Sequence, residues 1–155
     1  MLRTKKRLWL CCTLLCLNLA FIWGNSLLPR EASAALSRWV LNFLTSLNPD
    51  DAGLSVAGDG PLRKAAHFLE FCSLGMLLSW LFGMLRSKHW QRAAFPLLCG
   101  IAAACLDETI QCFVPGRGPG IKDVGIDTLG VILGIVIIYF INQKLKSKYL
   151  EEQTL

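Results

Sequence analysis

Long apolar stretches alternate with short polar segments along the chain, and four of the stretches are long enough to cross a membrane. A helix needs about 20 residues, at about 1.5 Å each, to span the hydrocarbon core. The stretches predict transmembrane helices at about residues 8–28, 65–85, 91–113 and 124–143. We therefore expect an all-α membrane protein, in which one four-helix bundle forms a single domain over residues 1–155.

The connection between the first two stretches has a different pattern, with apolar residues on one face of a helix. The residues of this face are Ala32, Leu36, Trp39, Val40, Phe43, Leu44 and Leu47. Such a face predicts a short helix that lies flat at the outer membrane–water interface. A loop is predicted for residues 48–61, because the segments 49–51 (PDD) and 58–61 (GDGP) are typical of turns.

Three polar clusters stand at the ends of the apolar stretches. They are residues 63–70 (RKAAHFLE), 107–111 (DETIQ) and 123–127 (DVGID). Ionisable groups at membrane depth are costly, so these clusters are candidates for a functional site. Because consecutive helices alternate in direction, all three clusters are expected at one depth, on one side of the membrane.

Helical spacing turns the clusters toward the interior of the bundle. The residues that share a helix face within each cluster are Arg63, His67 and Glu70, then Asp107 and Gln111, then Asp123 and Asp127. Gly130 and Gly134 continue the face of Asp127, and Gly75 lies deeper on the helix of His67. These small residues predict that each of these helices can approach a neighbouring helix closely.

Composition and charge agree with a membrane location. The chain is 54% hydrophobic and its mean hydropathy is positive, which is unusual for a soluble domain of this size. The net charge is +5, but the basic residues gather beside the apolar runs, where they are typical of topology signals, so no nucleic-acid partner is expected. The lipid bilayer is the expected partner.

The placement of lysine and arginine predicts the orientation in the cell membrane. Basic residues are concentrated in the N-terminal tail, the second connection and the C-terminal tail. The positive-inside rule places these regions, and hence both termini, in the cytoplasm. The first and third connections then face outward. The first apolar run is too long for a cleaved signal peptide, and we expect it to be retained as an anchor.

Three interpretations of the polar clusters stay open. In the first, the site binds anionic lipid headgroups or lipid-linked cell-envelope precursors, for which basic side chains suit phosphate oxygens. The candidate binding residues are Arg63, Lys64, Gln111, Arg117, Asp123 and Asp127. In the second, the charged groups pair with one another and only lock the outer helix ends.

The third interpretation is an enzyme, a phosphoester hydrolase or transferase that acts on a lipid-linked substrate. His67 would be the general acid or base, and Arg117 would stabilise developing negative charge. Glu70, Asp107 and Glu108 would tune His67 or hold a divalent metal. No cofactor and no metal site are predicted. His67 and Glu70 share a helix face and could hold a divalent ion, but such pairs are common and the nearby arginines favour internal pairing.

The clusters also carry a family resemblance. Residues 63–75, with the pattern R-K-x-x-H-F-x-E-F-x-x-L-G, and residues 107–117, with D-E-x-x-Q-x-F-x-P-G-R, resemble the two signatures of the VanZ-like membrane proteins. The second signature continues with D-V and T-x-G in residues 123–130. The resemblance implies a bacterial cell-envelope protein, and the family's namesake is associated with resistance to the glycopeptide antibiotic teicoplanin. Two positions depart from the family pattern: Phe71 replaces a frequent tyrosine, and Asp127, in place of a common asparagine, adds a carboxylate.

Overall fold

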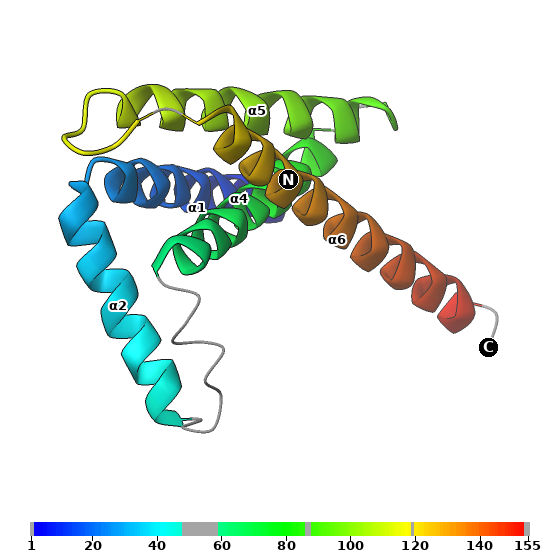
Figure 1. Cartoon of the computed structure of the whole chain (residues 1–155). Coiled ribbons are helices and arrows are strands. Elements are labelled where there is room, and N and C mark those ends of the chain that lie inside the picture. The colour runs from blue at the N-terminus through cyan, green and yellow to red at the C-terminus, as the bar shows by residue number, and fades with distance from the viewer. Residues whose placement is uncertain (1, 48–58, 86–87, 119, 154–155) are drawn as a thin grey trace.

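The computed structural model describes residues 2–47, 59–85, 88–118 and 120–153. Over these residues the chain forms five helices and no strand (Figure 1). The helices are α1 (Leu2–Ser26), α2 (Arg30–Leu47), α4 (Asp59–Met84), α5 (Gln91–Gln111) and α6 (Ile121–Gln153). All except α2 contain a segment long and apolar enough to cross a membrane. The predicted all-α architecture with four membrane-spanning helices is confirmed.

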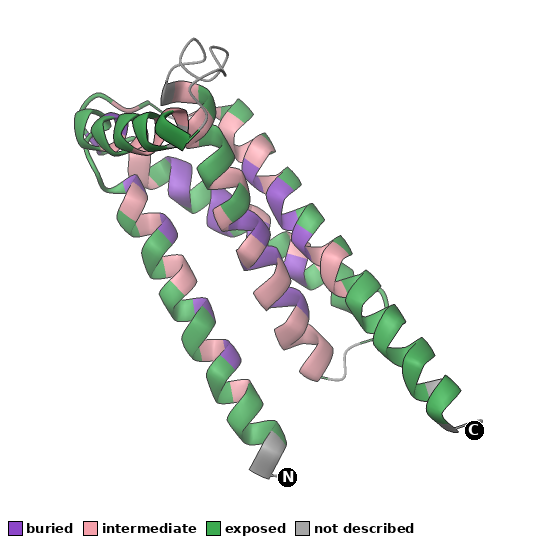
Figure 2. Ribbon diagram, turned by 90° about the horizontal axis from the view of Figure 1, so that it is seen from below, coloured by how far each residue is buried: buried purple, intermediate pink, exposed green. Residues whose placement is uncertain are grey.

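The helix α4 lies at the centre of the bundle. It contacts each of the other four helices, and its contact with α6 is the most extensive. The buried apolar core is formed by Cys11, Leu15, Ile22, Phe71, Leu74, Leu78, Ala103, Ala104 and Val131. Outside this core many large apolar side chains are exposed, among them Leu17 and Phe21 of α1. Figure 2 shows exposed positions along the ribbons of the long helices. Lipid chains cover such a surface in a membrane protein.

Glycines set the close contact between α4 and α6. A Cβ atom at Gly130 would collide with the backbone carbonyl of Phe68, and one at Gly134 with that of Cys72. A Cβ atom at Gly75 would likewise meet the backbone of α6. The two helices can approach this closely only without side chains at these positions, so the close contact predicted from the small residues is confirmed. This contact also holds the first turns of α6 beside the first turns of α4.

Several helix boundaries differ from the prediction: α1 already begins at Leu2, not near residue 8, and the differences at α4 and α6 have a local reason. α4 begins at Asp59, although a loop was predicted as far as residue 61. Pro61 is accepted there because the first N–H groups of a helix have no intrahelical partner. α6 continues to Gln153, well beyond the predicted end at about 143, because its glutamine, lysine and glutamate residues favour helix outside the membrane as well. Most of the predicted loop, residues 48–58, lies outside the described residues.

The amphipathic segment of the first connection forms α2, an 18-residue helix. Figure 2 shows that α2 crosses the end of the bundle that lies farthest from the two termini. The apolar side chains of Leu36, Trp39 and Phe43 are exposed on it. An exposed apolar face at the end of the bundle agrees with a position at the membrane surface, which stays a prediction.

Candidate functional site

The polar clusters meet at the end of the bundle that carries α2. α4 and α6 begin at this end, and α1 and α5 finish there (Figures 1 and 2). The residues of the three predicted clusters therefore lie on neighbouring helix ends. α1 adds Asn25 and Ser26, the last two residues of that helix. We call this assembly of side chains from α1, α4, α5, α6 and the α5–α6 connection the polar site.

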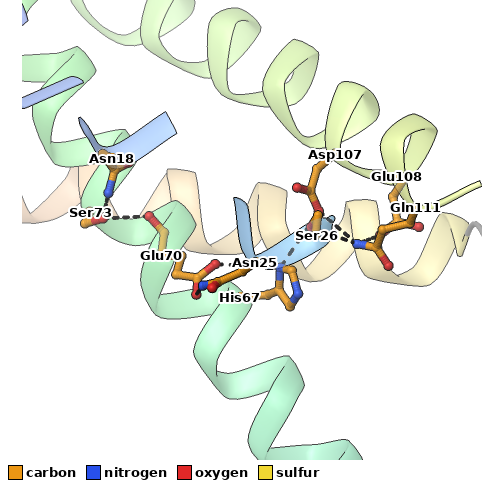
Figure 3. A network of polar contacts seen from close by, with 9 residues as sticks. All are labelled: Asn18, Asn25, Ser26, His67, Glu70, Ser73, Asp107, Glu108 and Gln111. Carbon is orange, nitrogen blue, oxygen red and sulfur yellow. Dashed lines mark hydrogen bonds and ion pairs between the residues drawn. The ribbon is translucent and has the colours of Figure 1, made fainter. Parts of the chain in front are cut away.

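The amide of Gln111 ties the end of α5 together and links it to α1. Its Nε2 donates to Oδ2 of Asp107 at 2.9 Å, to Oε1 of Glu108 at 3.2 Å and to Oγ of Ser26 at 3.4 Å (Figure 3). The other oxygen of Glu108, Oε2, accepts a hydrogen bond from the backbone N–H of Gly120 at 2.7 Å. One oxygen of Glu108 is thus bonded within α5, and the other holds the connection that leads into α6.

Glu70 joins α4 to α1. Its Oε1 accepts a hydrogen bond from Nδ2 of Asn25 at 2.8 Å. Its Oε2 lies 3.9 Å from Nδ1 of His67, which is also 3.9 Å from Oδ2 of Asp107. Both distances are too long for a hydrogen bond. The imidazole therefore faces two carboxylates without bonding to either (Figure 3).

The side chain of Asp127, on α6, lies close to those of His67 and Asp107. Single ligand atoms of His67, Asp107 and Asp127 lie within 4.8 Å of one another. Asp107 is fully buried and Asp127 is 2% exposed. No described residue forms a hydrogen bond or salt bridge with the Asp127 carboxylate, and Oδ1 of Asp107 is buried without a partner among them. Two buried carboxylate groups thus remain incompletely satisfied at the centre of the polar site.

The basic side chains of the polar site differ in whether an acidic group forms a salt bridge with them. Lys64 lies 3.5 Å from Asp123, in an exposed salt bridge of the kind that adds little stability. Arg63 and Arg117 form no salt bridge with any residue in the described ranges, and the Nε atom of Arg117 is buried without a partner there. Burial, and next to it the charge of Arg63, lower the pKa of the Arg117 guanidinium, while Asp107 and Glu108 oppose this shift. The two arginines are thus close enough to repel.

A small pocket opens between α4, α5 and α6. Arg63, Lys64, His67, Gln111 and Asp127 are among the residues that line it. Its volume is about 20 Å³, enough for one or two water molecules or a single ion. A phosphate group is larger than this volume, and the basic side chains that line the pocket are Arg63 and Lys64.

An apolar pocket of about 260 Å³ lies deeper between α1, α4 and α5. It is lined by Leu19, Trp23, Leu74, Leu78, Cys99, Ala102, Ala103 and Leu106. Trp23 is one helical turn from Ser26 on α1, and Ala103 is one turn from Asp107 on α5. The apolar pocket therefore begins directly below the polar site.

All side chains that the sequence predicted for the site lie at this end of the bundle. The structure brings His67 to 3.9 Å from both Glu70 and Asp107, whereas Arg63 and Arg117 form no salt bridge among the described residues. The sequence prediction missed the polar groups of α1. Asn25 and Ser26 stand at the end of the first apolar stretch, and the alternation of helix directions places that end at the depth of the clusters.

A second polar link that the prediction missed lies one turn deeper. Asn18 donates from Nδ2 to Oγ of Ser73 at 2.6 Å, and Ser73 donates to the backbone carbonyl of Glu70 at 2.7 Å (Figure 3). Asn18 is an amide within the apolar part of α1, and Ser73 lies one helical turn after Glu70 on α4. The amide of Asn18 was the available signal, since a polar side chain in the membrane interior needs a partner.

Comparison with known proteins agrees with this arrangement. No curated protein and no solved structure matches the chain. The model of the VanZ/LLP1 family matches residues 8–142, a range that includes all four membrane-spanning segments almost completely and the whole polar site. The chain is a multi-pass membrane protein and belongs to the VanZ/LLP1 family.

Proposed function

We propose that the polar site binds the phosphate-bearing headgroup of an anionic lipid, or of a lipid-linked cell-envelope precursor, in the outer leaflet of the membrane. The observation that carries this proposal is the arginine pair, Arg63 and Arg117. Both side chains are half-buried, they repel each other, and no described residue neutralises either of them through a salt bridge. Guanidinium groups suit phosphate oxygens because they donate two parallel hydrogen bonds, so a bound phosphate would relieve this repulsion.

The apolar pocket supports a lipid rather than a free phosphate ion as the ligand. A cavity of about 150 Å³ with apolar walls already accepts a molecule of the size of benzene. The pocket below the polar site has a volume of about 260 Å³ and is lined almost entirely by apolar side chains. An acyl or polyprenyl chain could occupy this pocket while its phosphate group contacts the arginine pair above it.

The outward orientation is part of the proposal and rests on the distribution of basic residues. The structure places both chain termini away from the polar site, at the opposite end of the bundle (Figure 2). The basic tails at that end favour the cytoplasmic side. The polar site would then lie at the headgroup level of the outer leaflet, where envelope precursors are accessible.

The geometry favours binding over acid–base catalysis. A general base is held in position for proton transfer by a hydrogen bond to a neighbouring group. His67 is 3.9 Å from both Glu70 and Asp107, so neither carboxylate orients the imidazole through a hydrogen bond. Glu108 and Gln111 are best explained as structural residues, because their hydrogen bonds hold the helix ends and the connection after α5.

The test is lipid binding by protein purified in a non-ionic detergent. Arg63→Gln and Arg117→Gln should each weaken binding of an anionic phospholipid about tenfold, since a charge-assisted hydrogen bond contributes about 1.5–3 kcal/mol. Arg38→Gln is the matched control, because it removes an exposed arginine from α2 and should leave binding unchanged. Inorganic phosphate and a lipid-linked pyrophosphate are titrated in parallel to identify the source of the phosphate group.

Unchanged lipid binding in the double variant Arg63→Gln/Arg117→Gln would refute the proposal. Equal affinity for inorganic phosphate and for the lipid would show that the apolar pocket contributes nothing to binding. A link to glycopeptide resistance is proposed on the family resemblance alone. It predicts that expression of the wild-type protein, but not of the double variant, changes the susceptibility of cells to teicoplanin.

A further inference from the structure

We propose that His67, Asp107 and Asp127 form a binding site for one divalent metal ion, held between α4, α5 and α6. The ligand atoms of these three residues lie within 4.8 Å of one another. Two ligands that bind one ion at 2.0–2.5 Å are separated by about 4–5 Å at most, so the three groups are already at coordinating distance from a common centre. The inference goes beyond the proposed function, because none of these residues belongs to the arginine pair.

The buried carboxylates of Asp107 and Asp127 favour a cation at this place, because a cation would balance their negative charge. Asp127 is 2% exposed, lines the small pocket and has no hydrogen bond or salt bridge with a described residue. A buried carboxylate is costly unless it is paired or coordinates a metal. Gln111 holds Oδ2 of Asp107 at 2.9 Å and leaves the buried Oδ1 free as a ligand. His67 is the only described side chain within salt-bridge distance of Asp107.

The ligand set indicates a first-row transition ion. One imidazole nitrogen with two carboxylates suits Mn²⁺ or Zn²⁺, whereas Mg²⁺ and Ca²⁺ prefer sites made only of oxygen. The pocket of about 20 Å³ beside His67 and Asp127 has room for the water that would complete the coordination. A carboxylate from Glu70 stands close by, since its Oε2 is buried, unpartnered within the described chain, and 3.9 Å from the imidazole.

A metal site here was not expected from the sequence, for a physical reason. Because arginines lie near the carboxylates in the sequence, we expected the two kinds of side chain to form salt bridges with each other. In the structure no described carboxylate forms a salt bridge with Arg63 or Arg117, and the third ligand comes from Asp127 on a different helix. The close glycine contact between α4 and α6 brings that aspartate to His67.

The experiment measures Mn²⁺ binding by chelator-treated protein in a non-ionic detergent, with a purification tag that contains no histidine. Mn²⁺ is the probe because the seven free cysteines of the chain could also bind Zn²⁺. The wild-type protein should bind one Mn²⁺ per chain, seen as loss of the free-ion paramagnetic resonance signal, and its Tm should rise on binding. Asp127→Asn should lower the affinity at least tenfold and abolish the rise in Tm.

The matched control is Glu31→Gln, which removes an exposed acidic residue of α2 that lies outside the polar site. It should bind Mn²⁺ within about twofold of wild type. If Asp127→Asn does not fold, Asp107→Asn provides the same comparison. The proposal is overturned if the wild-type protein binds no Mn²⁺, or if Asp127→Asn binds as well as Glu31→Gln does.

The metal and lipid proposals can fail separately. No phosphate-bearing lipid is present in this titration, so metal binding does not depend on the arginine pair being correct. Arg63→Gln/Arg117→Gln should still bind Mn²⁺, at least as tightly as the wild type, because the variant removes positive charge near the site. Loss of Mn²⁺ binding in Glu31→Gln as large as that in Asp127→Asn would show that Mn²⁺ responds to the general negative charge of the protein, and it would overturn the metal site.

Discussion

The pairing of Asn25 with Glu70 shows how single side chains stabilise this bundle. The carboxylate of Glu70 is largely shielded from solvent, and its Oε1 accepts a 2.8 Å hydrogen bond from the Asn25 amide. Its second oxygen has no hydrogen-bond partner among the described residues. The hydrogen bond from Asn25 therefore has a large effect on stability. Without it, the shielded carboxylate of Glu70 would have no hydrogen-bond donor among the described residues.

At this scale we predict that Asn25→Ala destabilises the protein by about 1–3 kcal/mol, the cost of leaving a buried acceptor unsatisfied. The measurement is thermal unfolding in detergent, followed by tryptophan fluorescence. Asn142→Ala, at an exposed position of α6, is the control and should change the stability by less than about 0.5 kcal/mol. A double-mutant cycle with Glu70→Ala should show coupling between the two residues, and strictly additive effects would contradict the contact.

The residues of the polar site were predictable to different degrees. His67, Glu70 and Asp107 were found because ionisable side chains stand out within apolar stretches. Asn25 was missed, because a neutral amide at the end of an apolar stretch barely changes the hydropathy pattern. The absence of a salt bridge at Arg117 could not be predicted either, since it depends on the directions of side chains from helices that are distant in sequence.

At the scale of the elements, the α4–α6 contact determines where the site lies. Gly130 and Gly134 bring the backbone of α6 against that of α4, and Asp127 lies one turn before Gly130. This places Asp127 beside His67, which precedes the contacted residue Phe68 on α4. The glycines therefore support the site, although they contain no polar side chain.

We predict that Gly134→Ala lowers the stability by about 1–3 kcal/mol, because overpacking forces the two backbones apart. The structure provides a control on the same helix, since a Cβ at Gly125 would meet no atom within 4 Å. Gly125→Ala should be neutral or slightly stabilising, as alanine favours helix more than glycine does. Thermal unfolding of both variants in detergent tests the difference, and equal Tm values would contradict the close contact.

The elements themselves were largely predictable, whereas their ends were not. Hydropathy and the span length located the four apolar helices, and helical spacing located α2. The ends differ because a helix does not stop where the hydrocarbon stops. α6 continues from the membrane segment to Gln153 through polar residues that are themselves good helix formers. Membrane thickness thus limits the apolar length of a helix but not its total length.

At the scale of the whole molecule, the bundle has two different ends. One end carries the polar site and α2, and the other carries both termini and the polar half of α6 (Figures 1 and 2). Between them, exposed apolar side chains such as Leu17, Phe21 and Phe140 surround the bundle. This arrangement requires that the polar site and the termini face opposite sides of the membrane, whichever way the protein is inserted.

The orientation itself gives the last prediction. In a background without cysteines, Gly118→Cys places a single thiol at an exposed position of the α5–α6 connection, and Lys148→Cys places one near the C-terminus. The positive-inside rule predicts that a thiol reagent unable to cross membranes labels Gly118→Cys in intact cells and Lys148→Cys only after the cells are opened. The reverse result would place the polar site at the cytoplasmic leaflet. The arginine pair would then face anionic lipids of the inner surface, so lipid binding could persist, but a role in capturing precursors outside the cell would be excluded.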